Sequence, residues 1–370
     1  MAQIIGQIES LKKIRWELSQ NNITRFNSIS EINYFLKNYE SELYEIHQVE
    51  KYKLNDEVNN LELALLALNK QYEKSKNQVT DKLNSQISSL NEKINRLKSS
   101  KSNFFFVRLF NWLQLKVAES KQYSLKRDFV RIIERKTNNI KDKVNEKSAR
   151  IDELTQNKEG IISLRCQSQI TQIAHTKRVV ESLSPLIAGA IGENLVVEEL
   201  KKLSDDYIVI NDFSLNFNPP IYNRKDNDRI FSIQIDHLLI TKSGIFIIET
   251  KNWSRKSIKR LDLRSPIEQI KRTSYALFVT LNSDSAHSDL NLNNHHWGKK
   301  QIPIRNVVVM INEKPKERFN YVSIKCLYEL IDYITYFDPA FTDSEFKNIF
   351  NYLSERINNT TTSYYNIHFS

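Results

Sequence analysis

The runs RIFSIQIDHLLI at residues 229–240 and GIFIIETK at residues 244–251 decide the fold of the second half of this chain. Both are rich in β-branched and aromatic residues, and only a short polar segment separates them. This spacing predicts two antiparallel strands joined by a tight turn at Lys242–Ser243–Gly244. The hairpin is apolar except at its open end, where charged residues gather.

Two acids and a lysine are expected to meet at that open end. Asp236 lies seven residues before Ser243 and Glu249 six after it, so their carboxylates should face each other across the ladder. Lys251 is two residues beyond Glu249 and falls on the same face. Adjacent carboxylates repel each other unless a cation or a proton lies between them. The pattern predicts a site for Mg²⁺ (or Mn²⁺) that hydrolyses phosphodiesters, with Lys251 orienting water or stabilising charge on a phosphate.

An exposed cross-strand salt bridge of Lys251 is the alternative interpretation of these three residues alone. The elements around them support a larger fold. After Pro185, patterns typical of helices and strands follow one another along the chain. Strands are expected at 207–212, 229–240, 244–251, 304–311 and 321–325, and helices at 187–207, 265–282, 327–335 and 344–356.

The whole set resembles the nuclease-related domain (NERD) family of the PD-(D/E)xK nuclease superfamily. The resemblance covers about residues 186–312 and is carried by GAIGENL at 189–195, the Asp236 strand, GIFIIETKNW at 244–253 and the helix with Gln269. It implies an α/β fold with an αβββαβ restriction-endonuclease-like core, a mixed sheet flanked by helices. It also implies site roles for Glu193 as the acid of the first helix, Asp236 and Glu249 as further metal-binding acids, Lys251 as the motif lysine and Gln269 as a polar site residue.

The chain departs from the family at two places. Ser254-Arg255-Lys256 stands where members often place a glycine, and the insertion FSLNFNPPIYNRKDNDR at 213–229 is long and polar. Many members are bacterial proteins of DNA transactions or phage defence, which favours DNA over RNA as the substrate. Positive side chains directly after the site suit a polyanion, although a solvated loop would also contain them. These candidate phosphate-binding residues are Arg255, Lys256, Lys259, Arg260 and Arg264.

The first half of the chain has the composition of long helices. Neither glycine nor proline occurs between Gly6 and Gly160, and apolar residues recur at alternating spacings of three and four. This periodicity predicts an all-α antiparallel coiled-coil hairpin with its bend near Ser99–Asn103. One continuous helix in a parallel dimer is the alternative. In either arrangement the coiled coil would serve a homo-oligomer or a partner protein.

Four regions are expected: short N-terminal helices at 1–47, the hairpin at 48–184, the nuclease-like domain at 185–326 and C-terminal helices at 327–370. The aromatic run from Phe104 to Trp112 near the bend either caps the hairpin or contacts a partner or a membrane surface.

The net charge of +10 suits an anionic partner without identifying it. The absence of a signal-peptide pattern and the two isolated cysteines favour a cytoplasmic protein. The leading hypothesis is a magnesium-dependent nuclease. The alternatives are a nucleic-acid-binding protein that does not cut and a coiled-coil scaffold.

Overall fold

The computed structural model describes residues 1–100, 104–253, 264–292, 298–315, 317–356, 367 and 369. The chain forms two compact units. The sheet unit comprises Met1–Asn38 and Ala174–Ser370, and the hairpin unit comprises Tyr39–Ile173. In contrast to the boundary expected after residue 47, helix α2 (Ile29–Ser99) continues through that position, and the first 38 residues belong to the sheet unit.

The sheet unit is built on a six-stranded mixed sheet. Its strands follow the order β1-β2-β3-β4-β5-β6. The β2–β3 and β3–β4 pairs are antiparallel, whereas the β1–β2, β4–β5 and β5–β6 pairs are parallel. The strands are β1 (Gln3–Ile5), β2 (Ile208–Asn223), β3 (Asp228–Thr241), β4 (Gly244–Lys251), β5 (Ile304–Met310) and β6 (Val322–Cys326). The predicted fold class, a mixed α/β sheet flanked by helices after an N-terminal helical hairpin, is confirmed.

Helices cover both faces of the sheet. One face packs against α6 (Ser184–Leu200), the short 3₁₀ helix η1 (Leu327–Glu329) and α10 (Leu330–Thr335). The other face packs against α8 (Arg264–Asn282), α9 (Asp284–Leu290) and α11 (Asp343–Ser354). Because each face is buried, β4 is apolar at consecutive positions and buries every residue before Lys251.

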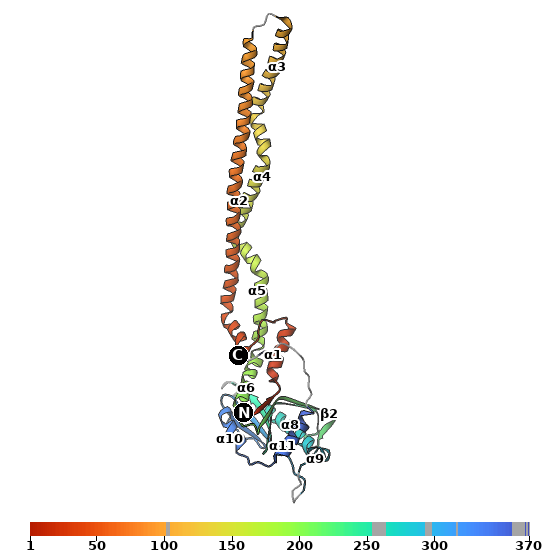
Figure 1. The fold of residues 1–370 in the computed structure, drawn as a ribbon. Helices are drawn as coiled ribbons and strands as arrows, with labels where there is room; N and C mark the ends of the chain where they lie inside the picture. The colour runs from red at the N-terminus through yellow and green to blue at the C-terminus, as the bar shows by residue number, and fades with distance from the viewer. Residues whose placement is uncertain are drawn as a thin grey trace. The chain divides into compact units, whose positions relative to one another are not determined.

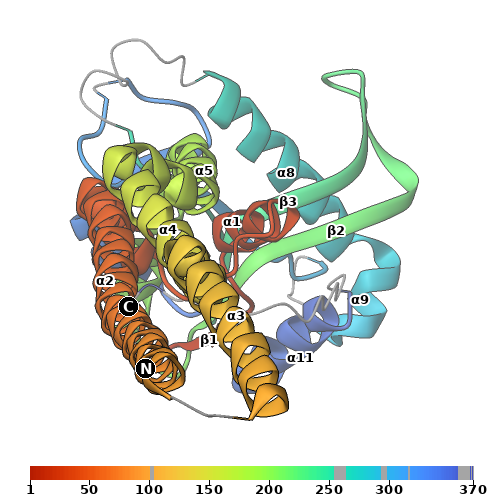
Figure 2. The same ribbon diagram turned by 90° about the horizontal axis from the view of Figure 1, so that it is seen from above.

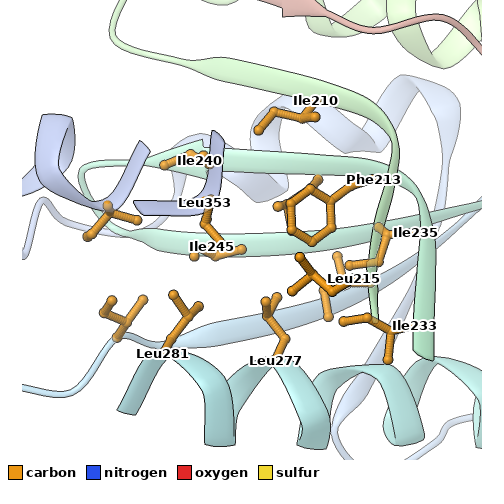
Figure 3. Packing of buried hydrophobic residues seen from close by; sticks show 14 of the residues in the cluster. Ile210, Phe213, Leu215, Ile233, Ile235, Ile240, Ile245, Leu277, Leu281 and Leu353 are labelled. Carbon is orange, nitrogen blue, oxygen red and sulfur yellow. The ribbon is translucent and has the colours of Figure 1, made fainter. Parts of the chain in front are cut away.

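The two cores are closely packed. Phe246 is fully buried on one face, with its ring centroid 6.2 Å from that of Tyr333 and 5.8 Å from that of Phe337. On the other face, Leu277 and Leu281 of α8 point toward the sheet (Figure 3). The sheet is therefore a rigid platform for the residues at its strand ends.

The N-terminal segment adds an edge to this platform. Strand β1 pairs in parallel with β2, and α1 (Glu9–Gln20) contacts α6 while it buries Leu11, Ile14 and Leu18. From the sequence, only short helices were predicted here. A strand of three residues gives too short a pattern to be distinguished from a loop.

Most of the expected polar insertion at 213–229 is strand. Figure 2 shows β2 and β3 running side by side to a common turn. Phe213 and Leu215 of β2 are buried in the core, and the register with β3 shifts between Asn216 and Ile221, around Pro219 and Pro220. The proline pair and the asparagines gave the segment the composition of a loop, but proline is tolerated where a ladder is interrupted.

The hairpin unit is an antiparallel pair of helical arms. The first arm is α2, and the second consists of α3 (Phe105–Arg127), α4 (Phe129–Gln156) and the start of α5 (Lys158–Ser182) (Figure 1). Lys98 Nζ lies 3.0 Å from Glu119 Oε1, whereas Glu57, earlier in α2, lies 2.7 Å from Arg165.

These pairs have the antiparallel order that was predicted, and the continuous-helix alternative is wrong. Helix α2 ends at Ser99, at the expected bend, and residues 101–103 lie outside the described part of the chain. Leu54, Leu154, Ile162 and Cys166 form one buried cluster between the arms.

None of the described helices is by itself long and apolar enough to cross a membrane. Helices α5 and α6 reach that length and composition only when they are taken together, and α6 buries Val196 and Leu200 within the sheet unit.

Candidate active site

A pocket of about 570 Å³ lies in the sheet unit where β3 and β4 carry their acidic residues. Side chains from α1, α6, β3, β4 and α8 line it. Five residues expected to form a site are among them: Glu193, Asp236, Glu249, Lys251 and Gln269. Residues separated by as many as 76 positions in the sequence therefore share one cavity.

The strand register places Asp236 beside Glu249. The β3–β4 ladder runs from Thr241↔Gly244 to His237↔Ile248, and Asp236 and Glu249 are the next residues along the two strands. The ladder opens there, and the backbone N–H of Thr250 donates to Asp236 Oδ2 over 2.8 Å. That bond holds the Asp236 carboxylate against the end of β4.

Glycine at position 192 brings Glu193 to the same place. A Cβ atom at Gly192 would lie 2.9 Å from Asn252 Cβ and 3.4 Å from Thr250 Cγ2. The first of these distances is too short for two carbon atoms that are not bonded to each other. Helix α6 can therefore approach the end of β4 only without a side chain at this position. The neighbouring Glu193 is buried and lines the pocket beside Asp236.

Lys251 provides positive charge in this group. Its Nζ donates to Glu249 Oε1 over 2.8 Å. Burial alone would lower the pKa of Lys251, but the charges of Glu249, Asp236 and Glu193 outweigh burial and the pKa is raised. The side chain is consequently an ammonium group throughout the physiological range of pH.

Two acids of the pocket, Glu193 and Asp236, have raised pKa values. Burial raises the pKa of Glu193 to about 7, assisted by the charges of Glu9 and Glu249 and opposed by a hydrogen bond from Ser10. Burial, then Glu249 and Glu193, also raise the pKa of Asp236 well above its ordinary value. Glu193 Oε2 is buried without a hydrogen-bond partner among the described residues. Glu193 and Asp236 therefore hold their protons more tightly, and a bound cation could take the place of those protons.

The donor set suits a hard divalent cation. Across the described ranges, no three His, Cys, Asp or Glu side chains are already arranged as a metal cluster. Mg²⁺ does not need one, because it is held by one or two carboxylates and completes its shell with water and substrate phosphate. Glu193 Oε2, unpartnered within the described part of the chain, and the shared position of Glu193, Asp236 and Glu249 in one pocket fit this kind of cation.

The structure does not test the basic residues expected to bind phosphate. Arg255, Lys256, Lys259 and Arg260 lie outside the described residues. Arg264 is the first residue of α8, and its side chain also lies outside them.

A comparison of the sequence with protein families identifies the segment that carries these site residues. Residues 188–311 match the family model of the nuclease-related domain. This segment is a NERD domain. It begins in α6, ends just after β5 and contains Glu193, Asp236, Glu249, Lys251 and Gln269. The resemblance found in the sequence is thus confirmed, over about a third of the chain. Neither the curated proteins nor the solved structures gave a match.

One part of the pocket comes from outside the NERD domain. Glu9, Ser10 and Lys13 of α1 line it, and Ser10 Oγ donates to Glu193 Oε1 over 2.5 Å. These residues were not predicted from the sequence. Ser10 and Glu193 are 183 positions apart, and no local pattern in the N-terminal segment signals such a contact.

Proposed function

We propose that the NERD domain hydrolyses phosphodiester bonds of nucleic acid, DNA in the first place, with Mg²⁺ or Mn²⁺ as its cofactor. The observation that carries the proposal is the convergence of Glu193, Asp236, Glu249 and Lys251 in one pocket. The family match supports a nuclease-related function, and the resemblance to metal-dependent nucleases supports the finer assignment.

The charge of the pocket explains why a cation is needed. Nucleic acid is a polyanion, and a phosphate that approached these three acids would be repelled when they are ionised. Lys251 cannot cancel that repulsion alone, because it already donates to Glu249. A divalent cation would neutralise the acids and attract the substrate to the same point.

Asp236 and Glu249 would hold the ion from the strand ends, and Glu193 would complete the site from α6. When bound, a divalent cation supplies Lewis-acid polarisation of the phosphate and lowers the pKa of water. Lys251, as a permanent ammonium, would position the attacking water or stabilise charge on the phosphate oxygens. Gln269 lies within the pocket and would orient the substrate through its amide.

Substrate affinity would come from the basic residues that follow the site. We assign phosphate contacts to Arg255, Lys256, Lys259, Arg260 and Arg264, because they follow the motif lysine closely in sequence. The hairpin unit would serve self-association or a partner protein.

The test is cleavage of circular DNA, linear DNA, single-stranded DNA and RNA with Mg²⁺, Mn²⁺ or EDTA. Asp236→Asn keeps the shape of the side chain but removes its charge, so we expect cleavage to fall by at least about 10³-fold. Asp205→Asn changes an exposed acid of the same unit and serves as the control.

Metal-dependent cleavage that Asp236→Asn abolishes and Asp205→Asn leaves intact would support the proposal. Equal cleavage by the wild type and Asp236→Asn would contradict the mechanism. Nucleic-acid binding without cleavage under every condition would favour the alternative of a binding protein that does not cut.

A further inference from the structure

The hairpin unit carries an exposed aromatic cluster at the start of its second arm. We call residues 104–117 the aromatic tip. Phe104 is 76% exposed, Phe105 73% and Phe106 82%, and Phe110 and Trp112 are more than half exposed. Exposed aromatic groups of this number on one segment are rare on a surface that faces only water.

The tip differs in polarity from an ordinary coiled coil, because amides share its inward side and aromatic residues lie on its outward side. The less exposed positions follow the spacing i, i+3, i+4 and i+7, the stripe directed at α2, and they are Asn111, Gln114, Leu115 and Ala118. Two of these four inward positions are amides, and Asn111 Nδ2 donates to Ser100 Oγ over 3.3 Å. The outward positions of the same turns are mostly aromatic or aliphatic. A helix surrounded by water places such residues the other way round.

Charge adds a second independent feature. Between Glu92 and Glu119 the sequence holds six basic residues and no acid. Arg108 and Lys116 lie on the tip itself and are exposed. The surface around the tip is therefore cationic as well as apolar, which matches an anionic, apolar environment.

A hollow at the tip combines both features. It has a volume of about 570 Å³ and is lined by Leu97, Leu109 and Trp112 together with Lys98 and Arg108. Lys98 pairs with Glu119, but no carboxylate among the described residues pairs with the Arg108 guanidinium. An unpaired guanidinium beside apolar walls suits a phosphate that is attached to a hydrocarbon chain.

We infer that the aromatic tip inserts into the surface of a membrane containing anionic lipid. The outward apolar residues spread over a broad arc of α3, and this arc is wider than the stripe that one partner helix would cover. A lipid bilayer can contact the whole arc. A second copy of the tip would bring like charges together. Aromatic side chains are also the residues that anchor proteins at the membrane interface.

The inference is tested with the full chain and vesicles of phosphatidylcholine, alone or mixed with phosphatidylglycerol. Co-sedimentation with the mixed vesicles should exceed that with neutral vesicles by at least about tenfold and weaken in high salt. Phe106→Ser with Phe110→Ser should reduce binding at least about tenfold, because it removes two rings that the bilayer would bury. Arg108→Glu with Lys116→Glu should reduce binding to the mixed vesicles by a similar factor.

Matched controls lie farther along α3. Tyr123 is as exposed as the tip aromatics, so Tyr123→Ser removes an aromatic ring away from the tip. Lys121→Glu with Lys126→Glu reverses two exposed charges of the same helix. All these side chains are exposed, so helix content measured by circular dichroism should not change. The assay needs neither metal nor nuclease activity.

Absence of binding to the mixed vesicles would overturn the inference. Equal losses for the tip variants and their controls would also overturn it, since binding would then be general surface attraction. If analytical ultracentrifugation finds an oligomer that Phe106→Ser with Phe110→Ser dissociates, while vesicles are not bound, the tip is instead covered by a second copy.

Discussion

The sheet unit and the hairpin unit each reverse the usual partition of polar and apolar side chains at one place. In the sheet unit the reversal is inward, because the acids Glu193 of α6 and Glu249 of β4 are buried. In the hairpin unit it is outward, because Phe106 and Phe110 face solvent while Asn111 is turned inward. Neither arrangement favours stability, so each agrees with the ligand proposed for its unit: a cation with nucleic acid for the sheet unit and an anionic membrane surface for the hairpin unit.

The largest expected effect is on the rate of nucleic-acid cleavage, which should depend on the sheet unit and not on the aromatic tip. Lys251→Met should lower the rate of nucleic-acid cleavage by about 10²- to 10⁴-fold, because it removes the positive group beside the reacting phosphate. Phe106→Ser with Phe110→Ser should leave that rate unchanged. Initial rates with a plasmid substrate measure both effects.

The control for this prediction is Lys347→Met, which removes an exposed lysine on α11 of the same unit. The separation would fail if the tip variant lost as much cleavage as Lys251→Met. It would also fail if Lys251→Met cut at the wild-type rate.

The next effect is on stability: a truncated core side chain should cost more free energy of unfolding in the sheet unit than in the hairpin unit. Phe246 is fully buried between the sheet and two aromatic rings, and Phe246→Ala should cost about 3–5 kcal/mol of stability. Leu61 is only partly buried between the arms, and Leu61→Ala should cost about 1–2 kcal/mol. Amide hydrogen exchange, measured segment by segment, should report each loss within its own unit. Similar losses for both variants would mean that the hairpin is packed as tightly as the sheet.

The sheet unit should lose stability as pH rises toward neutrality. The folded pKa of Glu193 is about 7 and its ordinary value is 4.5, so the folded state keeps a proton that the unfolded state releases first. The resulting stabilisation is complete below about pH 4.5 and is lost as pH rises through about 7, on the order of 3 kcal/mol in total. Asp236 contributes in the same direction.

Urea unfolding in EDTA at several pH values, followed by tryptophan fluorescence, measures this slope. Glu193→Gln should flatten it, because the variant removes one titrating acid and part of the repulsion that raises the pKa of Asp236. Mg²⁺ should restore stability at pH 7 in the wild type. A slope that is unchanged in Glu193→Gln would assign the pH dependence to other groups.

The sequence was informative where contacts are local or follow a regular register. The turn between β3 and β4 has two central residues, so counting along the strands placed Asp236 next to Glu249. The antiparallel arms followed from helical periodicity and the lapse of that pattern after Ser99.

The sequence was uninformative where a contact joins distant segments without a pattern. Strand β1 is three residues long, and its partner β2 begins at Ile208. Likewise, the helical pattern lapses near the aromatic run, so the sequence left open whether these rings cap the hairpin or face outward. Which side chains of the aromatic tip face outward was therefore visible only in three dimensions.

The smallest expected effect concerns the contact that the sequence did not reveal. Ser10 donates to Glu193 Oε1, and this bond lowers the pKa of Glu193 against the effect of burial. In Ser10→Ala the pKa of Glu193 should rise further, so cleavage should fall about three- to tenfold at pH 7 and recover at higher pH. Ser10→Thr keeps the hydroxyl and should restore activity, whereas Ser19→Ala, a change in the same helix, should have no effect. A loss of activity that is equal at every pH would mean that Ser10 only supports the fold. A loss confined to neutral pH would place the first twenty residues, which lie outside the NERD match, within the catalytic unit as a part that adjusts the charge of its acids.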